Sequence, residues 1–178
     1  MSFKAELDDK LTKFIGEQKM FFTASAPVSG RINLSPKGID SFRVFDNKTV
    51  GYMDLTGSGN ETAAHIHENG RLTVMFCSFT DKPLILRLYG HGEVIKNGSE
   101  KWKTYENLFE HYFGERQIIL LNIESVQTSC GFGVPVYNLV EERTTLTDWA
   151  EGKDEAKIEA YWRQKNLTSI DGLPTHLL

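Results

Sequence analysis

The sequence predicts a mainly β fold, a small antiparallel barrel of six or seven strands with helices inserted and appended. Apolar and β-branched runs recur along the middle of the chain and are separated by short turns, which is typical of hairpins. These runs do not alternate with helices, so a parallel sheet is not expected. With 178 residues, 40% of them hydrophobic, the chain is expected to form a single domain over residues 1–178.

Charge and cysteine content narrow the class of function. A net charge of −4 provides no basic field, so nucleic acid is not an expected partner. No apolar run is long enough to span a bilayer, and residues 1–18 lack the apolar core of a signal peptide, so no membrane association is expected. The two cysteines, Cys77 and Cys130, lie in strand-like stretches, which favours a reduced, cytoplasmic protein.

In the first third of the chain, apolar residues at helical spacing predict a helix over residues 3–17. Residues 20–26 and 31–35 alternate as strands around a Pro-Gly turn and predict a hairpin, which Pro36-Lys37-Gly38 is expected to break. A second hairpin is expected from residues 42–45 and 49–54.

The middle of the chain predicts a short helix over residues 61–69, ended by Gly70. Two long β-rich runs follow, residues 72–79 and 84–95. Arg87 lies inside the second run, and because an unpaired buried guanidinium is costly, it is expected to pair with an acid, to pair with a bound anion, or to lie at a solvent-exposed edge.

In the last third, an aromatic stripe predicts a helix over about residues 100–113, followed by a strand over residues 118–126. The small residues of 127–137 fit either a flat approach to a planar ligand or a barrel corner. The C-terminal tail is expected to be helical over 146–166 and irregular over 169–178.

The stretch from Asp54 to His65 runs from a strand through glycines into a helix. Such a turn directs free backbone N–H groups at a ligand, and the helix dipole favours an anion such as phosphate. The same residues also fit an ordinary helix cap. The stretch is neither a dinucleotide fingerprint nor a P-loop. Lys37, held between Pro36 and Gly38, is a candidate to neutralise the anion, although an exposed lysine in a turn is the simpler interpretation.

Four motifs follow one another along the chain: Arg31 to Gly38, Thr56 to Thr62, Glu68 to Arg71, and Ser129 to Gly131. In this order they resemble the pyridoxamine 5′-phosphate oxidase-like, FMN-binding split-barrel family. The closing segments Tyr161-Trp162, Lys165-Asn166 and Ser169 to Pro174 resemble an uncharacterised branch of it.

The resemblance implies a six-stranded split barrel and a homodimer with FMN at the interface. It implies an FMN-dependent oxidoreductase in which hydride passes through the flavin, with a nicotinamide donor or another small-molecule substrate. Arg87 would reach the cofactor from the second subunit, and no catalytic side chain is assigned. The cofactor contacts implied by position are Ser35, Pro36, Lys37, Leu55, Thr56, Ser58, Asn60, Thr62 and Arg87, with Ser129 and Cys130 as polar candidates near the ring.

The chain departs from the family at two places. Glu61 and Thr62 stand where the family often has Arg or Lys, so the phosphate charge must be met elsewhere, by Lys37 or Arg87. The end of the chain lacks the basic motif that holds the phosphate of pyridoxamine phosphate, so oxidation of that substrate does not follow.

Two other functions stay open. In one, the groove holds FMN as a non-catalytic module. In the other, it binds haem through one of five histidines, although each is expected to be an ordinary surface residue: His65, His67, His91, His111 and His176. A serine hydrolase is not expected, because no Gly-x-Ser-x-Gly elbow is present.

Overall fold

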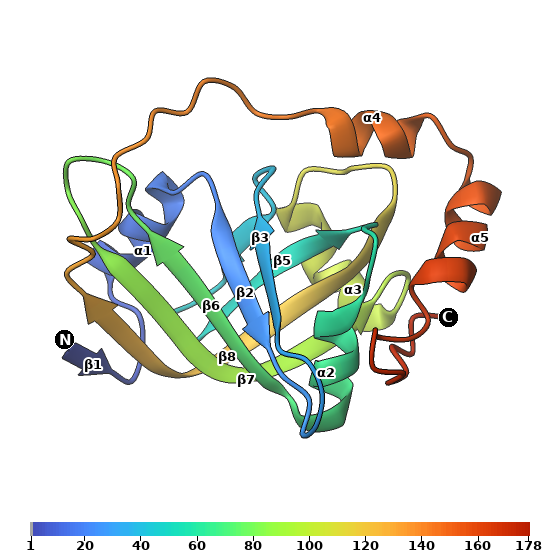
Figure 1. Cartoon of the computed structure of the whole chain (residues 1–178), viewed down its shortest axis with the longest axis horizontal. Coiled ribbons are helices and arrows are strands. Elements are labelled where there is room, and N and C mark those ends of the chain that lie inside the picture. Colours follow the sequence, from blue (N-terminus) through green and yellow to red (C-terminus); the bar gives the residue numbers. More distant parts are fainter. Residues whose placement is uncertain (1) are drawn as a thin grey trace.

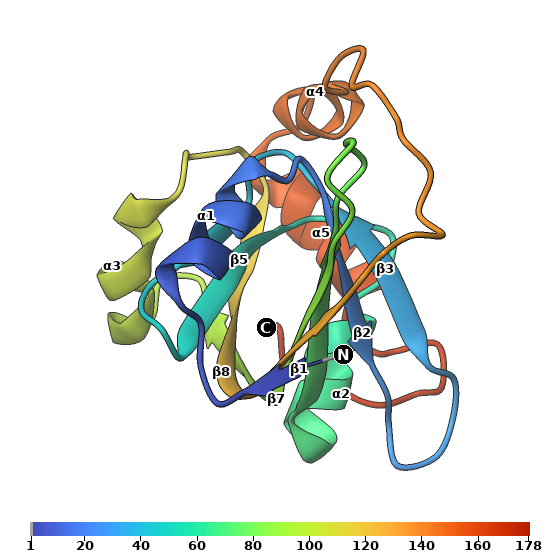
Figure 2. The same cartoon turned by 90° about the vertical axis from the view of Figure 1, so that its left-hand side faces the viewer.

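A computed structural model describes residues 2–178, and one antiparallel sheet of eight strands forms its centre (Figure 1). The sheet order is β3-β2-β6-β7-β8-β5-β4, with β1 paired to β8 outside this path. The strands are β1 (Ser2–Lys4), β2 (Phe21–Ser25), β3 (Asn33–Lys37), β4 (Phe42–Val44), β5 (Thr49–Leu55), β6 (Arg71–Cys77), β7 (Ile85–Lys96) and β8 (Glu115–Ser129). The sheet curls into a half-barrel (Figure 2), which confirms the predicted fold class. Six strands were implied, and the additional ones are β1 and β4, of three residues each.

Five α-helices and one 3-10 turn flank the sheet within residues 2–178. They are α1 (Asp9–Glu17), α2 (Glu61–Asn69), α3 (Glu100–Tyr105), η1 (Glu106–Leu108), α4 (Thr145–Glu151) and α5 (Glu155–Lys165). In this part of the chain, none of them combines the length and the apolar character that crossing a membrane requires.

The longest ladder joins β7 and β8, and it contains an irregularity at Tyr89 and Gly90. A Cβ atom built on Gly90 would lie 2.0 Å from the Asn122 carbonyl oxygen. Only glycine allows the two strands to approach so closely at this bend.

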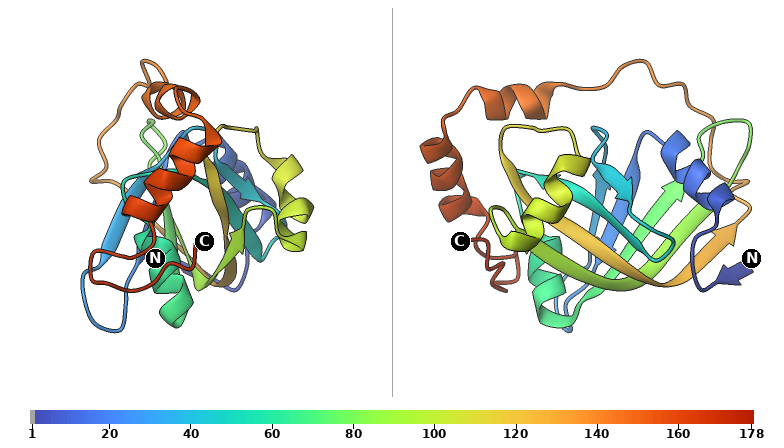
Figure 3. Two further views of the ribbon diagram at one scale, coloured as in Figure 1. Left: turned by 90° about the vertical axis from the view of Figure 1, so that its right-hand side faces the viewer. Right: turned by 180° about the vertical axis from the view of Figure 1, so that it is seen from behind.

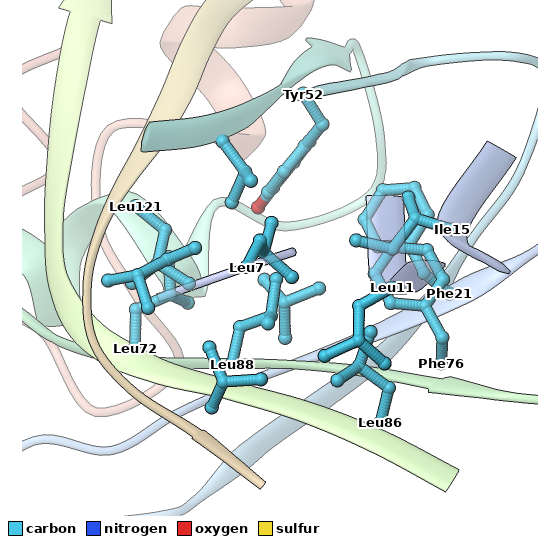
Figure 4. Close-up of a cluster of buried hydrophobic side chains, with 14 of the residues drawn as sticks. Leu7, Leu11, Ile15, Phe21, Tyr52, Leu72, Phe76, Leu86, Leu88 and Leu121 are labelled. Carbon is cyan, nitrogen blue, oxygen red and sulfur yellow. The ribbon is translucent and has the colours of Figure 1, made fainter. Parts of the chain in front are cut away.

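The main core fills the concave side of the half-barrel beneath α1 (Figure 4). Leu11 and Ile15 point from α1 towards Phe21, Phe76 and neighbouring leucines of the sheet. Each such side chain contributes about 1.5–3 kcal/mol when fully buried. A second cluster around Trp102 and Ile118 packs under α3.

The predicted N-terminal helix is wrong at its beginning. Residues 2–4 form β1, where Phe3 pairs with Gln127, and the helix begins only at Asp9. Asp8 is the reason, because its side chain accepts a hydrogen bond from the Leu11 N–H at 2.9 Å and caps the helix.

The predicted break at Pro36 is also wrong, since Pro36 and Lys37 continue β3 opposite Phe22 and Phe21. β3 is an edge strand of the sheet, where the missing N–H of proline costs no ladder hydrogen bond.

Three boundaries in the last third also differ from the prediction. α3 ends at Tyr105, well before residue 113, and β8 begins at Glu115 rather than at residue 118. The predicted tail helix is divided into α4 and α5, because Asp154 accepts a hydrogen bond from the Lys157 N–H at 2.8 Å and starts a new helix. Residues 131–144, named the strap, arch across the strand ends to α4 (Figures 1 and 2).

Candidate functional site

The loop between β5 and α2 forms one wall of a cleft of about 320 Å³. β3 forms the opposite wall, and Asp54, Glu61 and Arg116 bring charges into the cleft. Seven of the residues expected to contact a cofactor meet here: Ser35, Pro36, Lys37, Leu55, Ser58, Asn60 and Thr62.

α2 enters the cleft with an uncapped N-terminus. Asn60 occupies the N-cap position, but its side chain makes no capping hydrogen bond. Its Oδ1 instead accepts from Gln117 Nε2 at 2.7 Å. The first helical backbone bond runs from the Ala64 N–H to the Asn60 carbonyl, so the preceding N–H groups have no acceptor within the helix. The helix start therefore retains donors for an anion, and the capping alternative is not realised by Asn60.

Asp54 is the centre of a buried ionic cluster. Its Oδ2 accepts from Arg116 Nη2 at 2.7 Å and from Gln117 Nε2 at 2.8 Å, and its Oδ1 accepts from Lys37 Nζ at 2.8 Å. Burial opposes ionisation of this carboxyl, but the charges of Arg116 and Lys37 outweigh it and hold the pKa of Asp54 well below its usual range. Asp54 is therefore a carboxylate that fixes both cations in place.

Arg116 was missed by the sequence prediction. It is buried, and it reaches both Asp54 and the Gly59 carbonyl, which its Nη1 contacts at 2.9 Å. The sequence did indicate that Asp54 needs a cationic partner. Asp54 shares the strand face of Val50 and Tyr52, which predicts burial, and a buried carboxylate requires a cation beside it. The sequence does not say which cation is the partner, since Arg116 follows Asp54 by 62 residues.

The other carboxylate in the cleft, Glu61, is hydrogen-bonded to the C-terminal segment. Both carboxylate oxygens of Glu61 lie 3.1 Å from the Ile170 N–H, which donates to them from the C-terminal segment. Lys37 lies between its Asp54 partner and the face of the Tyr52 ring, 5.3 Å from the ring centroid. Lys37 was predicted as a candidate to neutralise an anion, and in the structure its charge is shared with Asp54.

The C-terminal segment, which comprises α5 and the residues after it, lies against the loop between β5 and α2 (Figure 3). Trp162 Nε1 donates to Thr56 Oγ1 at 2.8 Å, and the same hydroxyl donates to the Gly114 carbonyl at 2.7 Å. Thr56 therefore has a structural role and lines a second, larger cavity instead of the cleft. The two cavities adjoin, since both are lined by Pro36, Lys37 and Ser58.

Besides Thr56, three predicted residues lie outside the cleft. Arg87 lies on β7 and donates from Nη1 to Ser129 Oγ on β8 at 3.3 Å. Cys130 is exposed just beyond the end of β8. A single chain therefore does not bring Arg87, Ser129 and Cys130 to the other site residues.

The histidines do not form a metal centre in the described chain, residues 2–178, where no three His, Cys, Asp or Glu side chains converge. The expectation that His65 lies on the surface is wrong, because it is buried on α2 against β2, where its Nδ1 lies 2.9 Å from Ser25 Oγ. His67 and His176 pack ring against ring with centroids 4.9 Å apart.

Known proteins match both the sequence and the fold. The family model of pyridoxamine 5′-phosphate oxidase matches residues 7–130. The pyridoxamine 5′-phosphate oxidase family protein ustO of Aspergillus flavus is 40% identical over 190 residues, which cover 97% of this chain and 76% of the relative.

Two solved structures share the fold. A proposed pyridoxamine 5′-phosphate oxidase from Lactobacillus delbrueckii aligns with a TM-score of 0.55 and 19% identity, over 70% of this chain and 95% of that one. An FMN-binding protein from Syntrophomonas wolfei aligns with a TM-score of 0.52 and 11% identity, over 68% of this chain and 87% of that one. The family match and the 40% identity agree with the half-barrel: the chain belongs to the pyridoxamine 5′-phosphate oxidase family.

Proposed function

We propose that this protein is an FMN-dependent oxidoreductase that binds the FMN phosphate at the start of α2. The observation that carries the proposal is the uncapped N-terminus of α2, which opens into a cleft that also contains Arg116 and Lys37. Helix N-termini bind phosphate through free N–H groups and the helix dipole. The relative from Syntrophomonas wolfei, described as an FMN-binding protein, supports the choice of ligand.

The fit to a phosphate rests on hydrogen-bond donors more than on net charge. The cleft contains two cations, Arg116 and Lys37, and two carboxylates, Asp54 and Glu61, so its formal charges cancel (2 − 2 = 0). Asp54 pairs with both cations, and Glu61 accepts a hydrogen bond from the Ile170 N–H. The phosphate would therefore meet the backbone donors at the start of α2, with Arg116 and Lys37 nearby.

Bound FMN would supply hydride or electron transfer, while the protein supplies position and electrostatics. Ser35 and Pro36 lie on the β3 wall, where the cleft meets the larger cavity. The buried Asp54 cluster keeps the β3 and β8 cations fixed before any ligand arrives, which reduces the reorganisation needed for binding. No side chain is proposed as a general base.

A homodimer is part of the proposal, with a second copy supplying Arg87, Ser129 and Cys130. In residues 2–178 no carboxylate lies within salt-bridge distance of Arg87, although the side chain is only half-exposed. Leu34, 66% exposed on the edge strand β3, adds an apolar surface beside the cleft. A partner on this surface would bring a further cation to an anionic ligand. We also propose a cytoplasmic location, which the two free cysteines favour.

The test is the visible spectrum of the purified protein, after incubation with FMN, followed by titration with NADH and NADPH under nitrogen. The expected result is a two-band flavin spectrum that bleaches with a nicotinamide donor. Flavin that binds but stays oxidised with both donors would favour the non-catalytic module. A Soret band would favour haem, and a protein that takes up neither cofactor would overturn the proposal.

A further inference from the structure

A large chamber of about 1360 Å³ adjoins the proposed flavin cleft. Its floor includes Phe22 of β2 and Pro36 of β3, and its roof is the strap together with α4 and α5 (Figures 2 and 3). Typical small-molecule pockets measure about 300–1,000 Å³. The chamber therefore has room for a second molecule besides the part of a flavin that extends from the cleft.

Aromatic side chains line the chamber from several directions. Phe79 and Tyr137 pack with ring centroids 5.6 Å apart, and Trp149 and Tyr161 pack with centroids 5.1 Å apart. Aromatic walls of this kind favour planar or apolar ligands, because they offer large apolar faces at low cost in side-chain entropy.

The roof is attached at both of its ends. The Tyr137 N–H donates to the Phe79 carbonyl at 2.9 Å at one end. At the other end Ala150 and Ile158 are buried, and Trp162 is hydrogen-bonded to Thr56. The chamber is thus covered on one side by a fixed segment of the same chain and stays open at its rim. This roof lies beyond residue 130, where the match to the family model ends.

The charged side chains at the rim of the chamber carry no excess positive charge. Its exposed lining residues include two cations, Lys19 and Arg143, and three carboxylates, Glu17, Glu141 and Glu142, a formal sum of −1 (2 − 3 = −1). The remaining cation, Lys37, is already paired with Asp54. A phosphorylated substrate would find no free basic cluster here, whereas an uncharged one would lose little by desolvation.

We propose that the chamber binds the substrate of this oxidoreductase and that the substrate is an uncharged molecule with a planar aromatic body. The assignment as a substrate site rests on the proposed function, because the chamber shares Pro36, Lys37 and Ser58 with the cleft, so that a molecule inside it would lie next to a flavin. The binding chemistry itself depends only on the chamber walls.

The first experiment compares 1-naphthol with 1-naphthyl phosphate, which share a ring and differ in charge. Each is titrated into FMN-saturated protein, and binding is followed by the difference spectrum of the flavin. 1-Naphthol is expected to bind at least about tenfold more tightly, because the chamber has apolar walls and no excess positive charge to bind a phosphate. Equal binding, or tighter binding of the phosphate, would overturn the proposed substrate class.

The second experiment uses a matched pair of strap variants. Leu139 lines the chamber and is 57% exposed, whereas its neighbour Val140 is 92% exposed and does not line it. Leu139→Arg is expected to weaken 1-naphthol binding at least about tenfold, because it brings a charge into the apolar chamber, whereas Val140→Arg leaves it unchanged. FMN affinity should not change in either variant. Equal affinities for 1-naphthol in both variants would remove the chamber as its site.

Light scattering on the same variants identifies the other possible occupant. If Leu139→Arg converts a dimer into monomers, the chamber holds a second copy of the chain and the proposal is wrong.

If the protein binds no FMN, the proposed function fails, but the chamber is still tested by quenching of tryptophan fluorescence with 1-naphthol, since Trp149 lies in its wall. Quenching that Leu139→Arg abolishes would support the binding site, and the absence of quenching would overturn it.

Discussion

The side-chain amide of Asn166 donates a hydrogen bond to the Gly57 carbonyl at 3.1 Å, across 109 residues of sequence. Asn166 is fully buried, and its own carbonyl accepts from Thr175 Oγ1 at 2.6 Å. Together with the contact between Trp162 and Thr56, this bond attaches the C-terminal segment to the loop at the start of α2. The segment therefore contributes to the shape of the proposed phosphate site, although it lies outside the matched family region.

Asn166→Ala is expected to lower the free energy of unfolding by about 0.5–1.5 kcal/mol, because the half-buried Gly57 carbonyl loses its donor. It is also expected to weaken FMN binding several-fold, since Gly57 lies in the loop that forms the cleft. Urea denaturation and a flavin fluorescence titration measure the two effects. Gln164→Ala, an exposed position on the same helix, should change stability by less than about 0.5 kcal/mol. Reduced stability with unchanged FMN affinity would show that Asn166 stabilises the C-terminal segment but does not contribute to the FMN site.

Arg116→Met is expected to destabilise the protein by about 3–5 kcal/mol, because it removes the main counter-charge of a buried carboxylate. Adding Asp54→Asn should recover part of this loss, since the remaining side chain is uncharged. Urea unfolding of the single and double variants measures the coupling. Arg163→Met provides the control, because its exposed ion pair with Glu159 should contribute less than about 1 kcal/mol. A double variant less stable than Arg116→Met would contradict the buried-pair argument.

The low pKa of Asp54 predicts how stability depends on pH. In the unfolded chain the pKa of the Asp54 carboxyl is about 3.9, whereas in the folded protein it is lower. The unfolded state therefore binds more protons in acid, and the stability contributed by Asp54 is complete above about pH 5 and is lost as the pH falls further. Melting temperatures between pH 3 and 7 should fall more steeply for the wild type than for Asp54→Asn. Parallel curves would show that Asp54 does not control this dependence.

Arg87→Ala tests whether a second copy completes the site. If the partner's guanidinium contacts FMN, the variant should bind FMN about tenfold more weakly, which corresponds to about 1.4 kcal/mol. Stability should change little, because the one hydrogen bond that the Arg87 side chain makes within residues 2–178 is the long contact to Ser129. Lys82→Ala, in the exposed turn before β7, is the control for a general loss of positive charge. Unchanged FMN affinity in Arg87→Ala would remove this residue from the site.

Local patterns were sufficient to predict most of the sheet. The hairpin of β6 and β7 was predicted because β-branched and apolar residues flank a turn containing Pro83, and these signals act over a few residues. The beginning of α1 was not predicted, because the helical spacing of Phe3 and Leu7 does not reveal that Asp8 caps the helix. The loop at Gly57 was named as a candidate anion site because its glycines and its helix start are adjacent in sequence, and the structure places it in a cleft.

The partners of that loop could not be predicted in the same way. Asn166 and Arg116 reach it from distant parts of the chain, and each is selected by tertiary packing rather than by any neighbouring residue. The charge of Lys37 was identified, but its sharing with Asp54 depends on how β3 and β5 face each other across the cleft. Long-range polar contacts of this kind leave no periodic signal in the sequence.

The bond between Asn166 and Gly57 also sets an order of events during synthesis. Gly57 and all the strands of the sheet leave the ribosome before Trp162 and Asn166 do. A nascent chain can therefore assemble its sheet while the loop at the start of α2 is still open, and the loop reaches its final shape only after α5 has docked. On the proposed function, cofactor binding would therefore be a late step of maturation, and a chain cleaved within the strap is expected to keep its sheet but to bind the proposed cofactor weakly.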